Sequence, residues 1–371
     1  MGRTSVSFDE VFNGIFLASD VLTRESNMVV RTDKIQSDQV DQICEDREID
    51  LPADFMLQSG QSLNGEKIRL RLHGAVNGQP IVVLGGISAG KIVADAECNS
   101  VQMDKGWWAN IAGPKKSIDT ENDLIIGVDF APLQPTAPVI ITTHDQARII
   151  RHCLDQALGF APDDTPARKV IIVGASYGGM IGLAFAALFP DCVEKLFVIG
   201  AGQCAHPFGT AFRGVQRRII EFAMEAGEGG EGVALARQLA MISYRSLEEF
   251  GERFAVDGDE QANGVYPVCS YLVSRGDALS MSAERYLSLS DSIDRHLVDP
   301  AAISVPVLLV AIESDQLSPP KDIEKFAQDI KSGARFEIIK SLYGHDGFLK
   351  ETEAVGDWIK VFLESDEWQT R

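Results

Sequence analysis

Short apolar runs alternate with helical segments along most of the chain, and this alternation constrains the fold more than any other feature. The run Pro80–Gly86 (PIVVLGG) is apolar throughout, as expected of a strand that is covered on both faces of a sheet. Comparable runs occupy Asp123–Phe130, Val170–Gly174, Lys195–Gly202 and Val305–Asp315. Because strands that alternate with helices form parallel sheets, the pattern predicts an α/β fold with a mostly parallel, doubly wound sheet.

Turn and cap signals add detail around these runs. Asn64-Gly65 lies in a stretch that alternates polar and apolar residues, which predicts a β-hairpin. The four residues from Thr143 to Gln146 (THDQ) have the form of a capping box, in which two side chains bond the free N–H groups of a first helical turn. A helix is therefore expected over Ala147–Leu158.

The segment from His206 to about Arg295 has helical spacing throughout, broken by the glycine-rich stretch GEGGEG and by DGDEQANG. Strand-like runs lie on both sides of it, which indicates a helical insertion within one α/β domain. We therefore expect an acidic arm or irregular lead-in at 1–54, an α/β core at 55–205 and 299–371, and a helical lid insertion at 206–298.

The acidic composition excludes several classes of function. The 371 residues carry a formal net charge of -20, which opposes binding along the phosphates of a nucleic acid. The cysteines are scattered without a CxxC pair and the histidines form no HExxH motif, so we expect reduced thiols, a cytoplasmic location and no metal site. Met1–Asp20 does not resemble a signal peptide, and no apolar stretch is long enough to predict a membrane span.

Ser176 lies at the junction between a predicted buried strand and the helix that follows it. Gly174–Gly178 (GASYG) matches G-x-S-x-G, in which a strained turn exposes a serine for nucleophilic attack. The alternative is a glycine-rich turn or phosphate cradle, but a Walker lysine and the G-x-G-x-x-G spacing are absent. We interpret Ser176 as a candidate nucleophile, held at a helix N-terminus that would stabilise a developing oxyanion.

A nucleophilic serine needs a base and an acid that orients the base, and in folds of this kind they follow the serine along the chain. Asp315 ends an apolar run and His345 lies in YGHDGF, after the strand-like FEIIK. Glu313 competes with Asp315, and His206 and His144 compete with His345, but position in the chain favours the first pair.

The loop after Pro80–Leu84 is the candidate for the remaining part of an oxyanion hole. Its glycines, in GGIS, allow backbone N–H groups to approach a substrate oxygen. We nominate the N–H groups of Ile87 and Tyr177. An ordinary glycine turn is the alternative interpretation of this loop.

Four ordered motifs resemble the homoserine O-acyltransferases, a family of methionine biosynthesis with the α/β-hydrolase fold. GASYGGM resembles its nucleophile motif, and Gly106–Thr120 (GWWANIAGPKKSIDT) is similar to its long GWW…GPG…DT loop. Ala234–Ser246 (ALARQLAMISYRS) resembles its lid-helix motif, and YGHDGFL resembles its histidine motif. The likeness runs from about Phe55 to the C-terminus.

The resemblance implies a ping-pong acyl transfer through an acyl-serine. Ser176 would be the nucleophile, Asp315 the acid and His345 the base. Arg237 and Asp346 would hold the carboxylate and the amino group of L-homoserine, which are charges that such residues complement. The family also implies acyl-CoA as a co-substrate without a bound cofactor, and a homodimer.

The chain departs from the family at two places. GVDFAPLQPTAPV stands where members carry L-G-x-C-x-G-S/T-T-G-P, and GPKK replaces GPG. The acyl donor therefore stays open between acetyl-CoA and succinyl-CoA. A succinyl carboxylate would need an arginine, for which the candidates are Arg213, Arg217, Arg218 and Arg245.

Two other functions stay open. The first is a serine O-acyltransferase or an esterase that uses the same three residues. The second is a non-catalytic binding protein with a hydrolase fold.

Overall fold

The computed structural model describes residues 41–63, 65–98, 103–159, 168–255, 258, 263–264 and 266–365. Most of the predicted lead-in, residues 1–40, lies outside this part of the chain. The predicted turn residue Asn64 also lies outside it.

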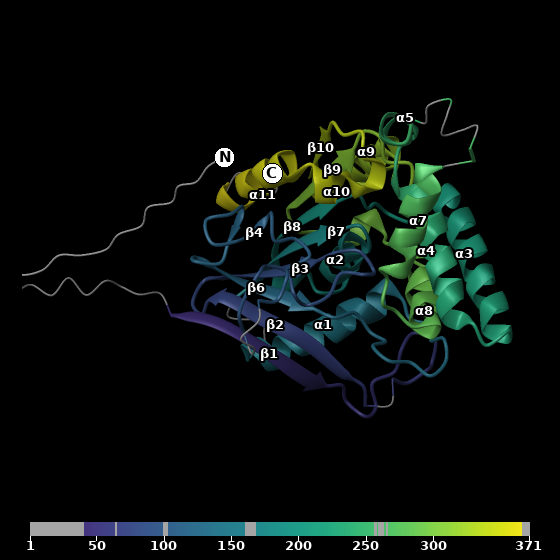
Figure 1. Cartoon of the computed structure of the whole chain (residues 1–371). Helices are drawn as coiled ribbons and strands as arrows, with labels where there is room; N and C mark the ends of the chain where they lie inside the picture. The colour runs from purple at the N-terminus through teal and green to yellow at the C-terminus, as the bar shows by residue number, and fades with distance from the viewer. Residues whose placement is uncertain are drawn as a thin grey trace, which may run out of the picture. The chain divides into compact units, whose positions relative to one another are not determined.

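Eight strands form the central sheet (Figure 1), in the order β1-β2-β6-β3-β7-β8-β9-β10. Their bounds are β1 Gln42–Asp50, β2 Lys67–Ala75, β3 Gln79–Leu84, β6 Asp123–Val128, β7 Val170–Ala175, β8 Val193–Ile199, β9 Val307–Ile312 and β10 Ala334–Ile339. From β6 to β10 every neighbouring pair is parallel, whereas β2 is antiparallel to β1 and to β6. The predicted mostly parallel α/β sheet is confirmed.

Strand β1 corrects the expectation of an irregular lead-in over its nine residues. Its sequence, QICEDREID, is highly charged, which hid the strand from pattern reasoning. An edge strand has a neighbour on one side only, so many of its side chains reach solvent, and charges there are common. Asp46 lies opposite Arg71 of β2, and their side chains form an ion pair of 2.7 Å.

The described residues before the predicted turn, 55–63, do not form the expected strand beside β2. β2 instead pairs antiparallel with β1 and with β6, and the described residues between β1 and β2, 51–63 and 65–66, form a loop. This loop bonds within itself, with an antiparallel bridge between Met56 and Ser62, and to a distant helix: the Gln58 amide donates to the Asp145 carboxylate at 2.9 Å. Leu51 donates to the Glu66 carbonyl at 3.2 Å, which closes the loop at its base.

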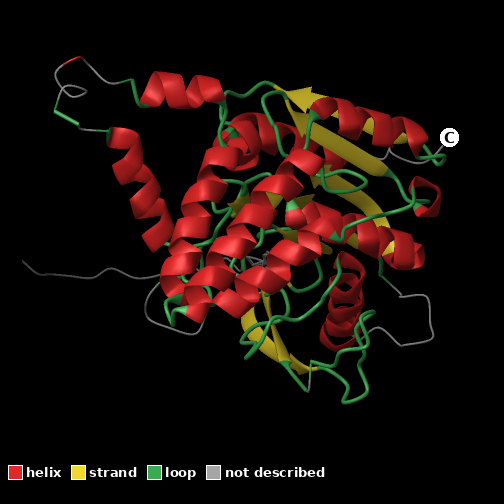
Figure 2. Cartoon of the chain, turned by 90° about the vertical axis from the view of Figure 1, so that its right-hand side faces the viewer, coloured by secondary structure: helices red, strands yellow, loops and turns green. Residues whose placement is uncertain are grey.

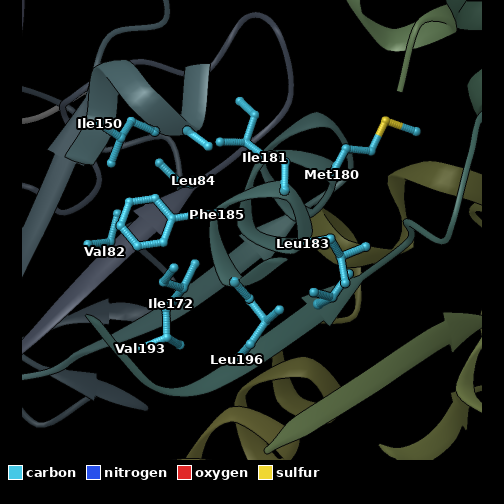
Figure 3. Close-up of a cluster of buried hydrophobic side chains, with 14 of the residues drawn as sticks. Val82, Leu84, Ile150, Ile172, Met180, Ile181, Leu183, Phe185, Val193 and Leu196 are labelled. Atoms are coloured by element: carbon cyan, nitrogen blue, oxygen red, sulfur yellow. The ribbon is translucent and has the colours of Figure 1, made fainter. Parts of the chain in front are cut away.

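Alternation along the strands divides the core between the two faces of the sheet. On β3, Val82 and Leu84 belong to one apolar cluster while Ile81 and Val83 belong to the other. The first cluster includes side chains of α1 (Thr143–Leu158), α2 (Tyr177–Leu188) and α9 (Pro320–Asp329). Figure 3 shows part of it, with Phe185 of α2 against Val82 and Ile172. The second cluster is covered by α11 (Thr352–Glu364) and by the segment around Trp108.

The cap of α1 differs by one residue from its prediction. The helix begins after Thr142, whose hydroxyl accepts from the Asp145 amide at 3.1 Å while the Asp145 carboxylate accepts from the Thr142 amide at 3.0 Å. Thr143 is buried, and its hydroxyl instead contacts Nδ1 of His296 at 2.8 Å. The helix itself covers the predicted residues.

The helical segment between β8 and β9 contains α3 (Pro207–Glu225), α4 (Gly229–Tyr244), α5 (Leu247–Arg253), α7 (Pro267–Asp277) and α8 (Ala283–Asp294). Figure 2 shows several of these helices in front of the strands. Shorter elements are β4 (Ala112–Gly113), β5 (Ile118–Asp119), α10 (Gly347–Lys350), and the 3₁₀ turns η1 (Pro190–Cys192), η2 (Pro300–Ala302) and η3 (Gly344–Asp346). Among the described residues, no helix is both long and apolar enough to span a bilayer.

A disulfide between Cys44 and Cys98 corrects the expectation that all the thiols are reduced. The Cα atoms of the pair lie 5.0 Å apart, because β1 runs beside the segment that follows β3. Their sequence separation of 54 residues gave no motif that pattern reasoning could use. Cys153 and Cys192 are buried free thiols, and Cys204 and Cys269 are exposed ones.

Candidate active site

The corner between β7 and α2 holds Ser176 in a conformation that is rare for a residue with a side chain. Its φ of 54° and ψ of -122° lie in a region that favours glycine. Neighbouring positions have no room for a Cβ atom. A Cβ on Gly178 would lie 2.3 Å from the Leu84 carbonyl carbon, and one on Gly174 would lie 2.6 Å from the Gly178 carbonyl oxygen. The small residues of the motif therefore allow the close approach that raises Ser176 above the sheet.

Ser176, His345 and Asp315 form one chain of hydrogen bonds. His345 Nε2 lies 2.7 Å from Ser176 Oγ, and His345 Nδ1 lies 2.7 Å from Asp315 Oδ2. A carboxylate only accepts hydrogen bonds, so Nδ1 carries the proton and Nε2 accepts from the serine hydroxyl. The other Asp315 oxygen accepts from the amides of Leu317 and Ser318 at 2.8 and 3.1 Å, which fixes the carboxylate.

The surroundings of His345 favour its protonated form. Burial lowers its pKa, but the charge of Asp315 and the hydrogen bond to it act in the opposite direction and outweigh burial. The neighbouring Asp346 also raises the pKa, whereas Arg213 lowers it. The net result is a pKa above the ordinary imidazole value, which suits a base that must accept a proton from serine.

The competing acid and bases lie elsewhere. Glu313 is exposed, whereas Asp315, two residues later, is buried. His206 caps α3 by accepting from the Phe208 amide at 3.2 Å, and its Nε2 lies 3.9 Å from the Asp322 carboxylate. His144 lies in the first turn of α1. Of the predicted histidines, the structure brings His345 to Ser176.

The two nominated oxyanion-hole residues lie beside Ser176. Ile87 and Tyr177 line both of the cavities that reach the serine. Tyr177 is the first residue of α2, where N–H groups have no partner within the helix. The Gly178 amide donates to the Gly85 carbonyl at 2.8 Å, which ties the loop after β3 to the helix start. The backbone of both nominated residues is therefore held close to the serine.

One cavity at Ser176, named here the Arg237 cavity, has a volume of about 150 Å³. Arg237 and Asp346 both line it, together with Ser176 and His345. Asp346 Oδ2 forms an ion pair of 3.0 Å with Arg245, and burial raises the Asp346 pKa while Arg245 lowers it. The structure thus brings the predicted substrate residues to the predicted nucleophile.

A second cavity, named here the Arg213 cavity, meets the first at Ser176 and has a volume of about 40 Å³. Arg213 lines it and pairs with Asp294 at 2.7 Å. The other three candidate arginines do not line this cavity. Arg217 also pairs with Asp294 at 2.7 Å, Arg218 is exposed, and Arg245 is buried against Glu249 and Asp346.

Two aromatic residues of the site were missed by the sequence reasoning. Tyr244 lines both cavities, and its ring lies 5.9 Å from that of His345. The Arg237 guanidinium lies 5.2 Å from the centre of the Tyr244 ring. The spacing of seven residues along α4 puts both on one helix face, which was a usable signal. Trp107, which lines the Arg237 cavity, lay within the resembling GWW segment.

Within the part of the chain that is described, no group of three or more His, Cys, Asp or Glu side chains is placed to hold an ion. The arrangement at Ser176 is one that supports covalent acyl chemistry by a serine, without a metal in any of its steps.

Comparisons with known proteins agree with the fold and with the motifs. A family model described as "alpha/beta hydrolase fold" matches residues 142–352. A homoserine O-succinyltransferase of Xanthomonas campestris pv. campestris is 35% identical over 293 residues, which are 78% of this chain and 76% of the relative. A homoserine O-acetyltransferase of Deinococcus radiodurans is 29% identical over 84% of this chain and 90% of its own length.

Solved structures give the same fold. The homoserine O-acetyltransferase of Bacillus anthracis superposes with a TM-score of 0.76 at 16% identity, covering 89% of this chain and 99% of that one. Esterase E22 superposes with a TM-score of 0.73 at 20% identity, covering 87% of this chain and 100% of its own. With the identity of the curated relatives and the hydrolase-fold match, these findings show that the chain belongs to the homoserine O-acyltransferase family of the α/β-hydrolase superfamily.

Proposed function

We propose that this protein transfers an acyl group from acyl-CoA to the hydroxyl of L-homoserine, through an acyl-Ser176 intermediate, as a step of methionine biosynthesis. The observation that supports this most directly is the hydrogen-bonded chain of Ser176, His345 and Asp315 where two cavities meet. The names of the curated relatives supply the substrate class.

The first half of the reaction acylates the enzyme. Nε2 of His345 takes the hydroxyl proton as Ser176 Oγ attacks the thioester carbon. The N–H groups of Ile87 and Tyr177 stabilise the oxyanion of the tetrahedral intermediate. The C–S bond then breaks, and the proton passes from His345 to the leaving thiolate of coenzyme A. Asp315 holds the imidazole in the tautomer that this transfer needs.

The second half transfers the acyl group to the amino acid. His345 removes the proton of the homoserine hydroxyl, whose oxygen attacks the acyl carbon; the Ser176 Oγ–C bond then breaks, and the proton passes from His345 back to Ser176 Oγ. Arg237 binds the amino-acid carboxylate and Asp346 binds its ammonium group, both from the wall of the Arg237 cavity. Orientation by this pair gives homoserine an advantage over water, which is needed because water would release the acyl group as free acid.

Release of coenzyme A tests the proposal. Purified protein with acetyl-CoA or succinyl-CoA is mixed with L-homoserine, with L-serine or with no amino acid. Fast release that requires L-homoserine supports the proposal. Release that is equally fast without an amino acid indicates an esterase, and a preference for L-serine indicates a serine O-acyltransferase. Absence of release under all three conditions, and of an acyl adduct on Ser176, contradicts it.

The lid is the segment 206–298, and we propose that it also joins two subunits. On α3, Val215 and Phe222 are 50% and 76% exposed, and on α4 Leu235 and Ile242 are 51% and 43% exposed. Each pair is seven residues apart, so both helices present an apolar stripe to solvent. Light scattering after gel filtration distinguishes a homodimer from a monomer.

We also place the protein in the cytoplasm, where acyl-CoA thioesters are formed; fractionation of the producing cells tests that location.

A further inference from the structure

We propose that Arg245 is a positioning residue for the amino-acid acceptor, because it holds the Asp346 carboxylate in place to bind the ammonium group. This inference rests on the proposed function, in which Asp346 binds that group. It adds a residue that lines neither cavity at Ser176 and therefore acts through Asp346. Lid helix α4 would then serve both charged ends of the acceptor, through Arg237 directly and through Arg245 at its C-terminal end.

The Asp346 carboxylate is held at one of its two oxygens. Its Oδ2 lies 3.0 Å from Nη2 of Arg245. Its Oδ1 has no hydrogen bond or ion pair with any residue that the structure describes, and the side chain does not cap α10, which begins at the next residue. Asp346 lines the Arg237 cavity beside Ser176. Arg245 thus fixes one oxygen and leaves the other to accept from an ammonium group.

Arg245 is itself fixed by a second carboxylate. Its Nη1 lies 2.8 and 3.0 Å from the two oxygens of Glu249, four residues later. The side chains of Arg245 and Glu249 are each only 5% exposed, so water does not replace these contacts. A guanidinium group is planar and presents its donors in a rigid fork, so the two carboxylates set its orientation. The position of Asp346 is therefore defined by a group that does not move freely.

Arg245 also favours the ionised form of Asp346. Burial raises the Asp346 pKa, and the charge of Arg245 is the largest influence that opposes burial. His345 and Arg237 act in the same direction as Arg245, whereas Glu249 acts against it. A neutral carboxyl group would lose the charge that pairs with ammonium. Removal of Arg245 therefore affects both the position and the charge of the carboxylate.

The backbone around Arg245 packs against the turn that carries Asp346. The next residue, Ser246, donates its hydroxyl to the Leu342 carbonyl at the start of that turn. A Cβ atom on Gly344 would lie 3.0 Å from the carbonyl carbon of Arg245. The corner between α4 and α5 is therefore fixed on the turn, which keeps the guanidinium within reach of the carboxylate.

Kinetics with and without the ammonium group test the role of Arg245. KM for L-homoserine is measured at saturating acetyl-CoA or succinyl-CoA, whichever releases coenzyme A faster. The Ki of γ-hydroxybutyrate is measured under the same conditions, because this competitor has the same hydroxyl and carboxylate but no ammonium group. We expect R245Q to raise KM by about 10- to 100-fold, as for loss of a hydrogen bond to a charged group, and to change Ki by less than about twofold.

Three further variants make the result specific. R245K keeps the positive charge and should restore part of the natural KM. R253Q is the matched control, since Arg253 lies 3.5 Å from the same Glu249 but is 42% exposed, and it should leave KM unchanged. R245Q leaves Glu249 buried with its main partner removed, which lowers stability. The double variant R245Q/E249Q removes that unpaired charge and should show the same rise in KM. In all four variants Ser176 should still be acylated, as judged by intact mass.

The outcomes separate this inference from the proposed function. A natural KM in R245Q with a native circular dichroism spectrum, or in the double variant if R245Q does not fold, overturns the role of Arg245. Equal rises in KM and Ki also overturn it, because they show a general loss of the cavity. A natural protein that binds γ-hydroxybutyrate as well as L-homoserine overturns it and leaves acyl transfer standing. If the natural protein forms no acyl adduct and releases no coenzyme A with L-homoserine, the proposed function has failed and this inference fails with it.

Discussion

Nε2 of His345 lies 2.7 Å from Oγ of Ser176, although 169 positions separate the two residues along the chain. The helical segment between β8 and β9 accounts for much of this separation. Its helix α4 ends beside the turn that carries His345. Gly344, next to His345, has a φ of 61°, and a Cβ atom there would lie 2.6 Å from the Tyr244 carbonyl oxygen. The turn that carries the histidine is thus packed directly against the end of lid helix α4.

Replacing Ser176 tests both its chemistry and its backbone. S176A and S176G both remove the hydroxyl, so neither should form an acyl adduct with acyl-CoA. The φ of 54° favours glycine and is unfavourable for serine and alanine alike. We therefore expect S176G to be more stable than S176A by about 1–3 kcal/mol, measured by chemical denaturation. Equal stability of the two variants would show that the corner is not strained.

The low-pH side of the pH–rate profile should follow the deprotonation of His345. Its pKa is raised above the ordinary value, and the base must be neutral to accept the serine proton, so kcat/KM should rise with pH through a midpoint above about 6.5. D315N removes the largest influence that raises the His345 pKa and leaves burial, which lowers it, opposed by Asp346. The midpoint should then move to lower pH, while the maximal rate falls by about 10³- to 10⁴-fold.

The matched control for this profile is E313Q, two residues earlier in the same loop. Glu313 is exposed, so the variant should keep the natural profile. A D315N midpoint that stays in place or rises would show that Asp315 does not set the protonation of His345.

The parallel strands and the candidate triad were predictable because their signals are local. Each buried strand is a short apolar run, and the corner at Ser176 requires small residues at fixed positions, such as Gly174 and Gly178. Strand β1 was not predictable in this way. Its charges are satisfied by partners distant in the sequence, such as Arg71, which no window of residues can reveal.

The residues of the substrate cavities also differ in whether the sequence could predict them. The lid motif pointed to Arg237, but nothing local distinguished Arg213 from Arg217 or Arg218 on the same helix. What separates them is their surroundings: Arg213 lines the cavity and pairs with Asp294, Arg217 pairs with Asp294 and donates to Ser290 without lining the cavity, and Arg218 is exposed. The disulfide was missed for the same reason, since two cysteines 54 residues apart pair only once β1 has been placed in the sheet.

The disulfide between Cys44 and Cys98 should stabilise the fold. Closing a loop of this length restricts the unfolded chain, and the expected contribution is about 2–4 kcal/mol. Dithiothreitol should lower the free energy of unfolding of the natural protein by that amount. C44S should already have the lower value and should not respond to the reductant. Identical denaturation curves for the natural protein with and without dithiothreitol would show that the bond does not form in solution.

Adding a methyl group to Gly344 should separate backbone strain from displacement of the lid. Gly344 and Gly333 both have positive φ, 61° and 89°, so alanine at either costs about 1 kcal/mol in strain. The Cβ of G333A would meet nothing within 4 Å, whereas that of G344A would collide with the Tyr244 carbonyl. Both variants should therefore lose stability, but G344A should lose more and should also lose acyl transfer, because the collision moves His345 away from Ser176. Denaturation and coenzyme A release measure the two effects, and equal activity of the two variants would contradict the coupling between α4 and the histidine turn.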